Sequence, residues 1–484
     1  MKALLEKYNI DYLLVNSTNE FLMEYTPLEE NDRYALTGFS GSTGDALLSR
    51  EELLLFVDGR YHIQADQEVF EGVEVVKLQA GQLFLDELAA RIKPGATLGV
   101  FARKNTQARV ETLEKKGVNV KLIVDKTQLS TRRLDRRNPQ LVNLSNHLTG
   151  LSTEEKAAQI KENLLVTNLE EVSYLFNIRD FSRPYTCAVK AKAVVIDAKA
   201  RLFTDMSEFE EFVKSFDDVL WVDKTTISAY DYGLCKQPRE LKDSPVKLMK
   251  SVKTDAEIEH YKDAFRRTDA TMLAIRDFIE QNDELSEYDI SQRLEEEFFK
   301  HGAKSLSFRP IVAVDKNSAL AHYSKASKDV ILQEGGLVLI DCGAYYEGGL
   351  ATDITRVFVK GEPSDLQKQV YTTILKAFES ANGSTGYEID NNVREFFAQN
   401  PIAGFEFTHG LGHGIGINVH ECPPSLSKHE LAKTEIKDNM CFSIEPGLYN
   451  AEHFGVRLEN VCYYKDGQII SFANAPFEGK LIWK

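Results

Sequence analysis

Three histidines and four glycines fall within the twelve residues His409-Gly-Leu-Gly-His413-Gly-Ile-Gly-Ile-Asn-Val-His420, although the whole chain has only ten histidines. Glycine allows tight or left-handed backbone and lets the chain pass close to a ligand. Imidazole is the commonest neutral metal ligand and the usual proton carrier near neutral pH. The stretch therefore predicts a backbone folded around a reactive centre, although taken alone it fits a glycine-rich turn with surface histidines equally well.

Four carboxylates flank this stretch in the sequence, and each lies in or beside an apolar, β-branched run that indicates a strand. They are Asp341, Asp353, Glu445 and Glu459. Burying an unpaired carboxylate costs free energy, so each should face solvent or have a strong partner. One such residue would be ordinary, but four around a histidine cluster predict the shell of a metal site.

The two aspartates lie at the ends of two expected strands, which are joined through the hairpin signal Glu347-Gly-Gly349. Pairing these strands would put Asp341 and Asp353 on one face. Two adjacent aspartates repel each other, so one would stay protonated unless a cation lies between them. The hairpin therefore favours a bound cation.

A second strand pair is expected to carry Glu445 and Glu459, joined through the turn at Asn450–Phe454. Arg457 is two residues from Glu459, so the two share a face of their strand. Four carboxylates and one imidazole favour Mn²⁺ or a similar divalent ion over a thiolate-type zinc site. Five ligands suit two ions better than one, and two ions roughly 3.5–4 Å apart can clamp a hydrolytic transition state.

A chain of 484 residues is too long for one core, and typical domain sizes give roughly three domains. The sequence predicts an α/β unit over residues 1–125, a second over residues 126–248, and a mixed helix-and-strand domain over residues 249–484. The acidic and imidazole residues gather only in the last of these, which is therefore expected to carry the chemistry.

The first two units repeat each other in outline. Leu164-Leu-Val-Thr-Asn168 echoes Leu13-Leu-Val-Asn-Ser17, and Leu202-Phe-Thr-Asp205 echoes Leu55-Phe-Val-Asp58. Self-similarity of this kind predicts two copies of one α/β unit, with chance similarity of short apolar strands as the alternative. The charged stretch Ser130–Pro139 between them lacks periodicity and is expected to be a linker or an exposed loop.

Helix starts are marked clearly in the last domain. Thr254-Asp-Ala-Glu257 and Ser286-Glu-Tyr-Asp289 match the capping-box pattern and precede apolar residues at helical spacing. A further helix is expected after Pro363-Ser364. Helices and strands are therefore mixed in this domain.

The chain has 58 basic and 74 acidic residues, a formal charge of -16 that argues against a general affinity for nucleic acid or anionic membranes. No apolar run approaches the roughly 18 residues of a membrane span. The start Met1–Lys7 lacks the apolar core of a secretory signal. The six cysteines show no CxxC spacing, so reduced thiols and a cytoplasmic location are expected.

The order Asp, Asp, His, Glu, Glu resembles the pita-bread metallopeptidases, which include methionine aminopeptidase, prolidase and aminopeptidase P. The flanks that carry this resemblance are Asp341-Cys-Gly, Thr352-Asp353-Ile-Thr-Arg, His409-Gly-x-Gly-His413-Gly, Glu445-Pro-Gly and Arg457-Leu-Glu459-Asn. Phe39-Ser-Gly-Ser-Thr-Gly44, Val57-Asp-Gly-Arg-Tyr61 and Glu171–Arg179 extend it to two creatinase-type α/β domains, as in the three-domain, cytosolic type of aminopeptidase P. The implied fold is therefore two creatinase-type domains followed by a pita-bread catalytic domain.

The resemblance also implies a role for each site residue. Two divalent ions, most often Mn²⁺ with Co²⁺ or Zn²⁺ as alternatives, would be held by Asp341, Asp353, His413, Glu445 and Glu459. Glu445 would also act as the general base. The histidines that would steady the tetrahedral intermediate, move protons and shape the proline pocket are His322, His409 and His420. Arg457 and Tyr449 would stand at substrate-binding positions.

The activity implied is that of an Xaa-Pro aminopeptidase, which releases the first residue of peptides with proline second by attack of a hydroxide bridging the two ions. The alternatives are an Xaa-Pro dipeptidase (prolidase) and, in a different class, a metal-free pita-bread binding module. A methionine aminopeptidase would not need two amino-terminal domains.

The chain departs from the family pattern at three points. The aspartates are twelve positions apart where the family usually has eleven, which one extra residue at the hairpin tip absorbs. The interval from His413 to His420 resembles that of compact bacterial members. The chain ends at Lys484 without the helical tail of larger relatives, so a homodimer is left open.

Overall fold

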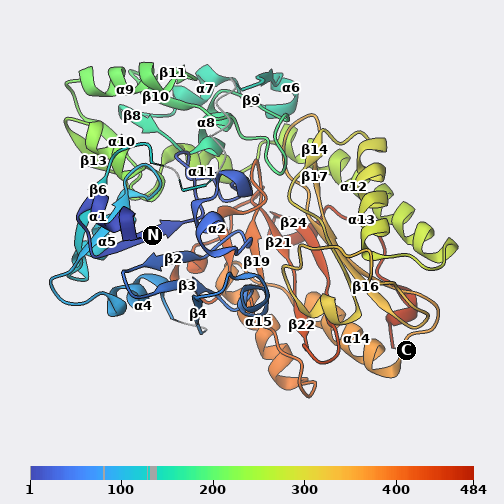
Figure 1. Cartoon of the computed structure of the whole chain (residues 1–484). Helices are drawn as coiled ribbons and strands as arrows, with labels where there is room; N and C mark the ends of the chain where they lie inside the picture. The colour runs from blue at the N-terminus through green and yellow to red at the C-terminus, as the bar shows by residue number, and fades with distance from the viewer. Residues whose placement is uncertain (1, 80–81, 128, 131–138, 484) are drawn as a thin grey trace. The chain divides into compact units, whose positions relative to one another are not determined.

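The computed structural model of the chain describes residues 2–79, 82–127, 129–130 and 139–483 (Figure 1). The chain forms two compact units. The amino-terminal unit comprises residues 1–139, 153–176 and 189–246, and the carboxyl-terminal unit comprises residues 140–152, 177–188 and 247–484. The linker expected at Ser130–Pro139 falls mostly on residues 131–138, outside the described residues.

The first sheet of the amino-terminal unit has the strand order β4-β3-β2-β1-β5-β6. Its strands are β1 (Tyr12–Asn16), β2 (Asp45–Leu48), β3 (Leu53–Val57), β4 (Val73–Lys77), β5 (Thr97–Phe101) and β6 (Asn119–Ile123). The helices of this region are α1 (Lys2–Tyr8), η1 (Leu28–Glu30), α2 (Asp32–Thr37), α3 (His62–Glu68), α4 (Phe84–Arg91) and α5 (Gln107–Lys115).

Strand β1 shows why its uninterrupted apolar run is needed. Successive side chains of a strand point to opposite faces of the sheet. Tyr12 and Leu14 pack in one core cluster with residues of α4 and α5, whereas Leu13 and Val15 pack in a second cluster with Leu5 of α1. Both faces of the sheet are covered, so the strand is apolar on both sides.

The second sheet of this unit has the order β11-β10-β8-β12-β13. Its strands are β8 (Leu164–Val166), β10 (Lys192–Ile196), β11 (Lys199–Phe203), β12 (Leu220–Val222) and β13 (Pro238–Glu240). Its helices are α7 (Thr153–Ala157), α8 (Leu169–Leu175), α9 (Met206–Ser215) and α10 (Ala229–Leu234). Strand β8 has an antiparallel neighbour, β10, and a parallel neighbour, β12, just as β1 has β2 and β5. The topology therefore repeats as the sequence predicts.

The carboxyl-terminal unit is built on a sheet of order β15-β16-β18-β24-β21-β19-β20, with β25 paired to β24. These strands are β15 (Ile311–Val314), β16 (Leu337–Cys342), β18 (Ile354–Val359), β19 (Gly412–Gly414), β20 (Glu421–Leu426), β21 (Cys441–Ile444), β24 (Glu459–Lys465) and β25 (Gln468–Ser471). Two-stranded pairs are formed by β7 (Val142–Asn143) with β9 (Ile178–Arg179), β14 (Ser305–Leu306) with β17 (Ala344–Tyr345), and β22 (Gly447–Tyr449) with β23 (Gly455–Arg457).

The helices of this unit are α6 (Asn146–Thr149), most of α11 (Pro245–Ser251), α12 (Asp255–Gln281), α13 (Glu287–Lys300), η2 (Asp315–Ala319), α14 (Asp365–Glu379), α15 (Gly386–Gln399), η3 (Glu430–Lys433) and η4 (Gly479–Leu481). Both predicted capping boxes are confirmed, with Thr254 and Glu257 at the start of α12 and Ser286 and Asp289 at the start of α13. Leu339 and Val357 of the sheet pack against Val370 of α14.

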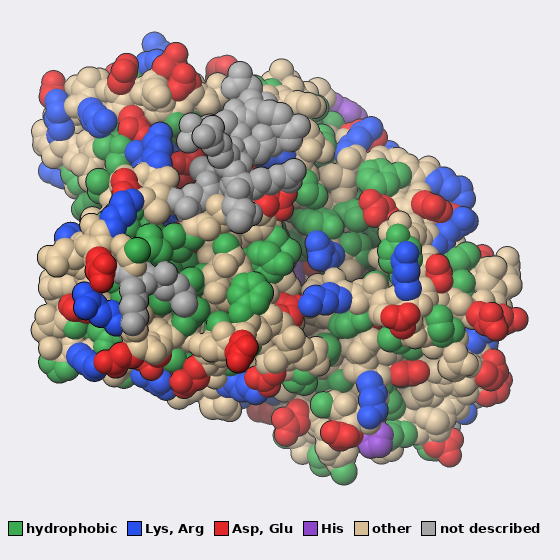
Figure 2. Space-filling view, in the orientation of Figure 1, with side chains coloured by type: hydrophobic (Ala, Val, Ile, Leu, Met, Phe, Trp, Pro, Cys, Tyr) green, Lys and Arg blue, Asp and Glu red, His purple; other side chains and the backbone are tan. Residues whose placement is uncertain are grey.

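On the face shown in Figure 2, acidic and basic side chains are interspersed. Among the residues that the structure describes, no helix combines the length and the apolar composition needed to cross a bilayer.

Candidate metal centre

Five adjacent strands of the carboxyl-terminal sheet each bring one predicted metal-binding residue to the same place. In sheet order, β16 carries Asp341, β18 is preceded by Asp353, β24 begins with Glu459, β21 is followed by Glu445, and β19 carries His413. These residues are spread over more than a hundred positions of the sequence. The antiparallel sheet therefore brings residues that are distant in the sequence into one cluster.

The register of the strands puts these side chains on one face. Asp341 pairs with Thr355, and Thr355 pairs with Glu459. Asp353 is two residues from Thr355, so its side chain points the same way. The hairpin prediction that both aspartates share a face is confirmed.

The side-chain atoms come within a few ångströms of one another. The candidate ligand atoms of Asp353, His413 and Glu459 all lie within 4.8 Å of one another. His413 Nε2 is 3.7 Å from Asp353 Oδ2 and 3.4 Å from Glu445 Oε1. Asp341 Oδ2 lies 2.7 Å from Nη2 of Arg457.

The carboxylates are too crowded to ionise normally. Burial and the neighbouring charges of Glu459 and Asp341 raise the pKa of Asp353 well above its usual range. Burial and the charges of Glu445 and Asp341 do the same to the pKa of Glu459. Burial raises the pKa of Glu445 to about 7, with Arg457 opposing the rise. Like charges disfavour ionisation in this way unless a cation compensates them.

Three carboxylate oxygens at this face are buried and accept no hydrogen bond: Asp341 Oδ1, Asp353 Oδ1 and Glu459 Oε1. Buried polar atoms normally have a partner. His413 presents its ring correctly for a ligand, because Nδ1–H donates to the Gly414 carbonyl at 3.0 Å and leaves the Nε2 lone pair toward the carboxylates. The donor set is oxygen-rich and fits hard divalent ions.

Comparison with known protein families identifies this part of the chain. Residues 259–466 match the model of metallopeptidase family M24. Residues 1–132 and 132–231 match two models of the creatinase/prolidase amino-terminal domain. Residues 259–466 therefore form a domain of the M24 metallopeptidase type. The predicted fold class, two creatinase-type domains followed by a pita-bread domain, is confirmed.

Several relatives are similar to this chain over nearly all of its length. It is 26% identical to Xaa-Pro aminopeptidase 1 of Dictyostelium discoideum, over 100% of this chain and 88% of that protein. It is 28% identical to a probable Xaa-Pro aminopeptidase P of Coprinopsis cinerea, over 96% of this chain and 86% of that protein. The crystal structure of X-prolyl aminopeptidase from Caenorhabditis elegans, described as a cytosolic enzyme with a di-nuclear active site, has the same fold, with a TM-score of 0.87 at 22% identity over 98% of this chain and 88% of that one.

A chain of hydrogen bonds in the M24 domain connects His409 to the carboxylates. Arg457 Nη1 donates to the Tyr449 hydroxyl at 2.8 Å, and that hydroxyl lies 2.8 Å from His409 Nε2. His409 Nδ1 lies 2.7 Å from the Gly410 carbonyl, so Nδ1 donates and Nε2 accepts from Tyr449. Arg457 also bonds Asp341, so one network joins three of the predicted site residues to a predicted ligand.

His420 lies directly against the cluster. Its ring meets that of His413 edge-on, with centroids 4.5 Å apart. The next residue, Glu421, is buried, lies 2.5 Å from Lys250 Nζ and 3.8 Å from Lys253 Nζ, and accepts the Asn418 N–H at 3.1 Å. This buried ion cluster fixes the loop that carries His420.

His322 lies outside the five strands, half-buried in the loop after η2. That loop is fixed by Glu287, whose carboxylate is fully buried at the start of α13. Glu287 accepts hydrogen bonds from Val314 N (2.8 Å), the Tyr323 hydroxyl (2.6 Å) and Ser327 N (3.0 Å). One carboxylate therefore ties together both sides of the loop that carries His322.

Three supporting residues were not predicted from the sequence: Thr355, Ser443 and Glu287. The Thr355 hydroxyl donates to Glu459 Oε2 at 2.6 Å and accepts from Arg457 Nε at 3.3 Å. The Ser443 hydroxyl accepts the His413 N–H at 3.1 Å and donates to Glu445 Oε1 at 3.3 Å. Thr355 and Ser443 are each two residues from a predicted ligand, so strand periodicity could have identified them.

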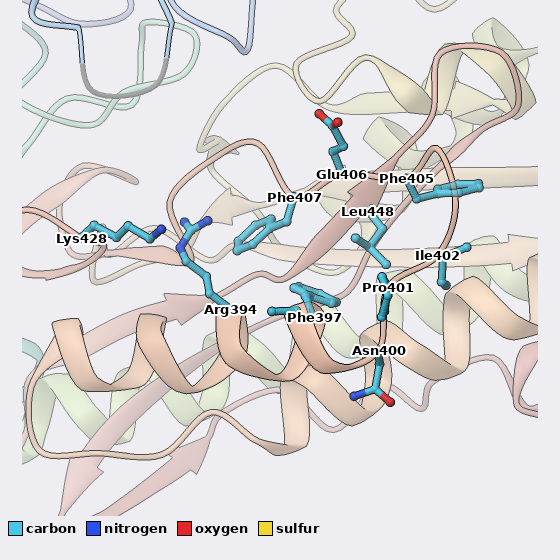
Figure 3. Close-up of a pocket in the computed structure, with 11 residues that line it drawn as sticks. Arg394, Phe397, Asn400, Pro401, Ile402, Phe405, Glu406, Phe407, Lys428 and Leu448 are labelled. Atoms are coloured by element: carbon cyan, nitrogen blue, oxygen red, sulfur yellow. The ribbon is translucent and has the colours of Figure 1, made fainter.

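A pocket of about 390 Å³ lies next to the hydrogen-bond network of His409, Tyr449 and Arg457 (Figure 3). Its walls include Phe397, Phe407 and Leu448, with Arg394 at 4.5 Å from the Phe407 ring. Phe407 also meets the His409 ring edge-on, with centroids 4.9 Å apart. Phe407 thus forms a wall of the pocket and supports His409.

Proposed function

We propose that this M24 metallopeptidase is an Xaa-Pro aminopeptidase, which removes the first residue from peptides whose second residue is proline. The observation that carries the proposal is the convergence of four carboxylates and one imidazole on a single face of the sheet. The names of the full-length relatives support the aminopeptidase over a dipeptidase. The intact ligand set argues against a metal-free binding module.

The proposed metal ligands are Asp341, Asp353, His413, Glu445 and Glu459. Two divalent ions at this face, which we take to be Mn²⁺, would supply Lewis-acid polarisation of the scissile carbonyl and a water that ionises near neutral pH. Glu445 is also proposed as the general base of the reaction. A cytoplasmic location is proposed on the sequence features and the absence of any paired cysteine among the described residues.

The three remaining histidines are proposed to act on substrate. His409 receives a hydrogen bond from Tyr449, so its orientation is fixed before substrate arrives. His420 is held beside His413 and is placed to stabilise charge that develops during hydrolysis. His322, in the loop after η2, is the third histidine proposed to act on substrate. Tyr449 and Arg457 are proposed at the substrate-binding edge, where they orient His409.

The choice of aminopeptidase over dipeptidase rests on Arg457. A dipeptidase must recognise the free carboxylate of its proline, usually with a cation. The Arg457 guanidinium is already bonded to Asp341, Tyr449 and Thr355, so its donors are directed to the protein. An enzyme without such a cation can leave this side open for the rest of a longer peptide.

A peptide panel with and without added Mn²⁺ tests the proposal. We expect Arg-Pro-Pro and longer Xaa-Pro peptides to be cleaved at rates at least comparable to Arg-Pro, and cleavage to stop in chelator and return with Mn²⁺. Efficient hydrolysis of Arg-Pro without turnover of Arg-Pro-Pro would instead identify a prolidase. No turnover of either peptide with Mn²⁺ bound would contradict both activities.

A further inference from the structure

Arg356 is a buried cation in β18 that the proposed reaction does not use. It lies three residues after the proposed ligand Asp353, and it is 1% exposed. A buried charge is costly unless hydrogen bonds satisfy it. The partners of this guanidinium therefore indicate which part of the fold it supports.

All five N–H groups of the guanidinium donate hydrogen bonds. Nη1 donates to the backbone carbonyls of Thr355 at 2.9 Å and Glu459 at 2.7 Å. Nη2 donates to Asn460 Oδ1 at 2.8 Å and to the Ala475 carbonyl at 2.8 Å, and Nε donates to the same carbonyl at 3.2 Å. The planar fork of the arginine therefore joins β18, β24 and the segment after β25.

The backbone ladder between β18 and β24 is short. It has two residue pairs, whereas six pairs join β16 to β18 and four join β21 to β24. This junction divides the sheet between the two aspartates and the other three proposed ligands. The bond from Arg356 to the Glu459 carbonyl therefore strengthens the sheet at the place where the two groups of ligands meet.

The Ala475 end of this link is held by helix α12. The Asp269 carboxylate, which is 7% exposed, accepts the backbone N–H groups of Asn474 at 2.8 Å and Ala475 at 2.9 Å. Ala475 is therefore held between a carboxylate and a guanidinium. The neighbouring Thr268 hydroxyl lies 3.0 Å from that of Thr352, which precedes a proposed ligand. Helix α12 thus anchors both the guanidinium link and the start of β18.

The side chain of Arg356 supports the metal centre from the opposite face of the sheet. Successive side chains of a strand alternate between its faces, so Arg356 points away from the face to which Thr355 contributes. Its bond to Glu459 is made to the backbone carbonyl and leaves the carboxylate available. Any influence on a bound ion must therefore pass through the positions of the strands.

We propose that Arg356 is a positioning residue of the metal centre, which fixes β18 against β24 and thereby sets the spacing of Asp353 and Glu459. This role rests on the proposed metal ligands. Metal sites require ligand atoms at narrowly defined distances, so a small change in strand spacing weakens binding. Lysine keeps the charge but has three donors on a single nitrogen, so it cannot replace the five-donor fork.

Calorimetric titration of the full-length, metal-free protein with Mn²⁺ compares the wild type with Arg356→Lys. We expect the variant to bind Mn²⁺ about tenfold more weakly, as is typical when a residue that supports a metal ligand is changed. At saturating Mn²⁺, kcat for Arg-Pro-Pro should also fall about tenfold. Unchanged affinity and kcat in the folded variant would overturn the positioning role and leave the metal centre intact. Absence of Mn²⁺ binding in the wild type would overturn the metal centre and this role together.

Arg33→Lys is the matched control, because Arg33 is also fully buried and bonded to carbonyls, but in the amino-terminal unit. Arg33 donates to the carbonyls of Thr43 at 2.6 Å and Gly44 at 2.9 Å. The variant should lower the free energy of unfolding in urea and still bind Mn²⁺ with wild-type affinity. If it weakened Mn²⁺ binding as much as Arg356→Lys does, the effect would be general destabilisation and the positioning role would be wrong.

Asp269→Asn keeps the test decisive if Arg356→Lys does not fold. The variant leaves the guanidinium in place and replaces the charge-assisted bonds to Asn474 and Ala475 with weaker neutral ones. We expect Mn²⁺ affinity to fall about threefold. An unchanged Mn²⁺ affinity in this variant would overturn the proposed link from α12 through Arg356 to the metal centre.

Discussion

Buried charges are balanced differently in the two units of the molecule. In the amino-terminal unit, three buried or half-buried cations each pair with one carboxylate: Lys104 with Asp32, Lys192 with Asp231, and Arg109 with Asp45. At the candidate metal centre, four carboxylates converge and Arg457 forms an ion pair with one of them, Asp341. Each of these three pairs is electrically balanced, whereas the carboxylates of the metal centre require added positive charge.

This difference separates charges that support the fold from charges that support chemistry. A buried ion pair loses much of its attraction to desolvation, and removing one partner is strongly destabilising. Carboxylates that repel one another behave oppositely, because removing one relieves the repulsion. The same substitution, aspartate to asparagine, should therefore have opposite effects on stability in the two units.

The largest expected effect is the loss of activity in Asp353→Asn. The variant removes a central ligand. Mutating a residue that only supports a metal ligand typically lowers activity or metal affinity by up to about 100-fold, so peptidase activity and bound Mn²⁺ should fall by more than this. At pH 8 its metal-free Tm should rise above that of the wild type, since one repelling charge is gone. Normal activity in this variant, or a lowered metal-free Tm, would contradict the proposed role of Asp353.

Asp32→Asn tests the opposite case, a buried carboxylate that has a cationic partner. It leaves Lys104 buried without its partner, so the amino-terminal unit should lose about 3–5 kcal/mol of unfolding free energy with or without Mn²⁺. Urea unfolding measures the change. Asp66→Asn, which breaks an ion pair half-exposed at the surface, should change stability by at most about 1 kcal/mol. Equal effects of the two variants would remove the distinction between buried and exposed pairs.

His420→Ala separates charge stabilisation from metal binding. We expect turnover of Arg-Pro-Pro to fall about 100-fold while bound Mn²⁺ stays near the wild-type content. His429→Ala, at an exposed position, is the matched control and should be fully active. If metal content fell in step with activity, His420 would be a ligand.

A smaller effect is expected for Glu287→Gln, which keeps the size of the side chain but removes its charge. The hydrogen bonds from Tyr323 and Ser327 are made to a carboxylate, and such bonds are stronger than neutral ones. A looser His322 loop should lower kcat about tenfold without changing metal content. Glu295→Gln, exposed on the same helix, controls for the loss of charge. An unchanged kcat would exclude a positioning role for Glu287.

Local sequence signals predicted a large part of this molecule. The capping boxes at Thr254 and Ser286 place two helices, because they depend on residues three positions apart. The Asp341–Asp353 hairpin was predictable because strand pairing fixes which side chains share a face.

Long-range packing was not predictable in the same way. Residues 140–152 and 177–188 belong to the carboxyl-terminal unit through strands β7 and β9, which have only two residues each and show no periodicity. The domain boundaries at 125 and 248 accordingly remain predictions. Glu287 was missed because its partners, such as Ser327, lie up to forty residues away in the sequence.

We expect the crowded carboxylates of the metal centre to hold divalent cations in place of protons. Burial and like charge raise the pKa values of Glu445, Asp353 and Glu459, so the metal-free protein keeps protons that the unfolded chain would release. Its stability should therefore fall as pH rises from about 4.5 through 7. Mn²⁺ must displace these protons, so binding should tighten over the same range.

The metal-free protein can be titrated calorimetrically with Mn²⁺ at pH 7. Repeating the titration in two buffers of different ionisation enthalpy measures both the number of Mn²⁺ ions bound per chain and the number of protons released. The account predicts two ions bound per chain and a net release of protons, both lost in Asp353→Asn. Absence of saturable Mn²⁺ binding, or binding without any proton release, would contradict it.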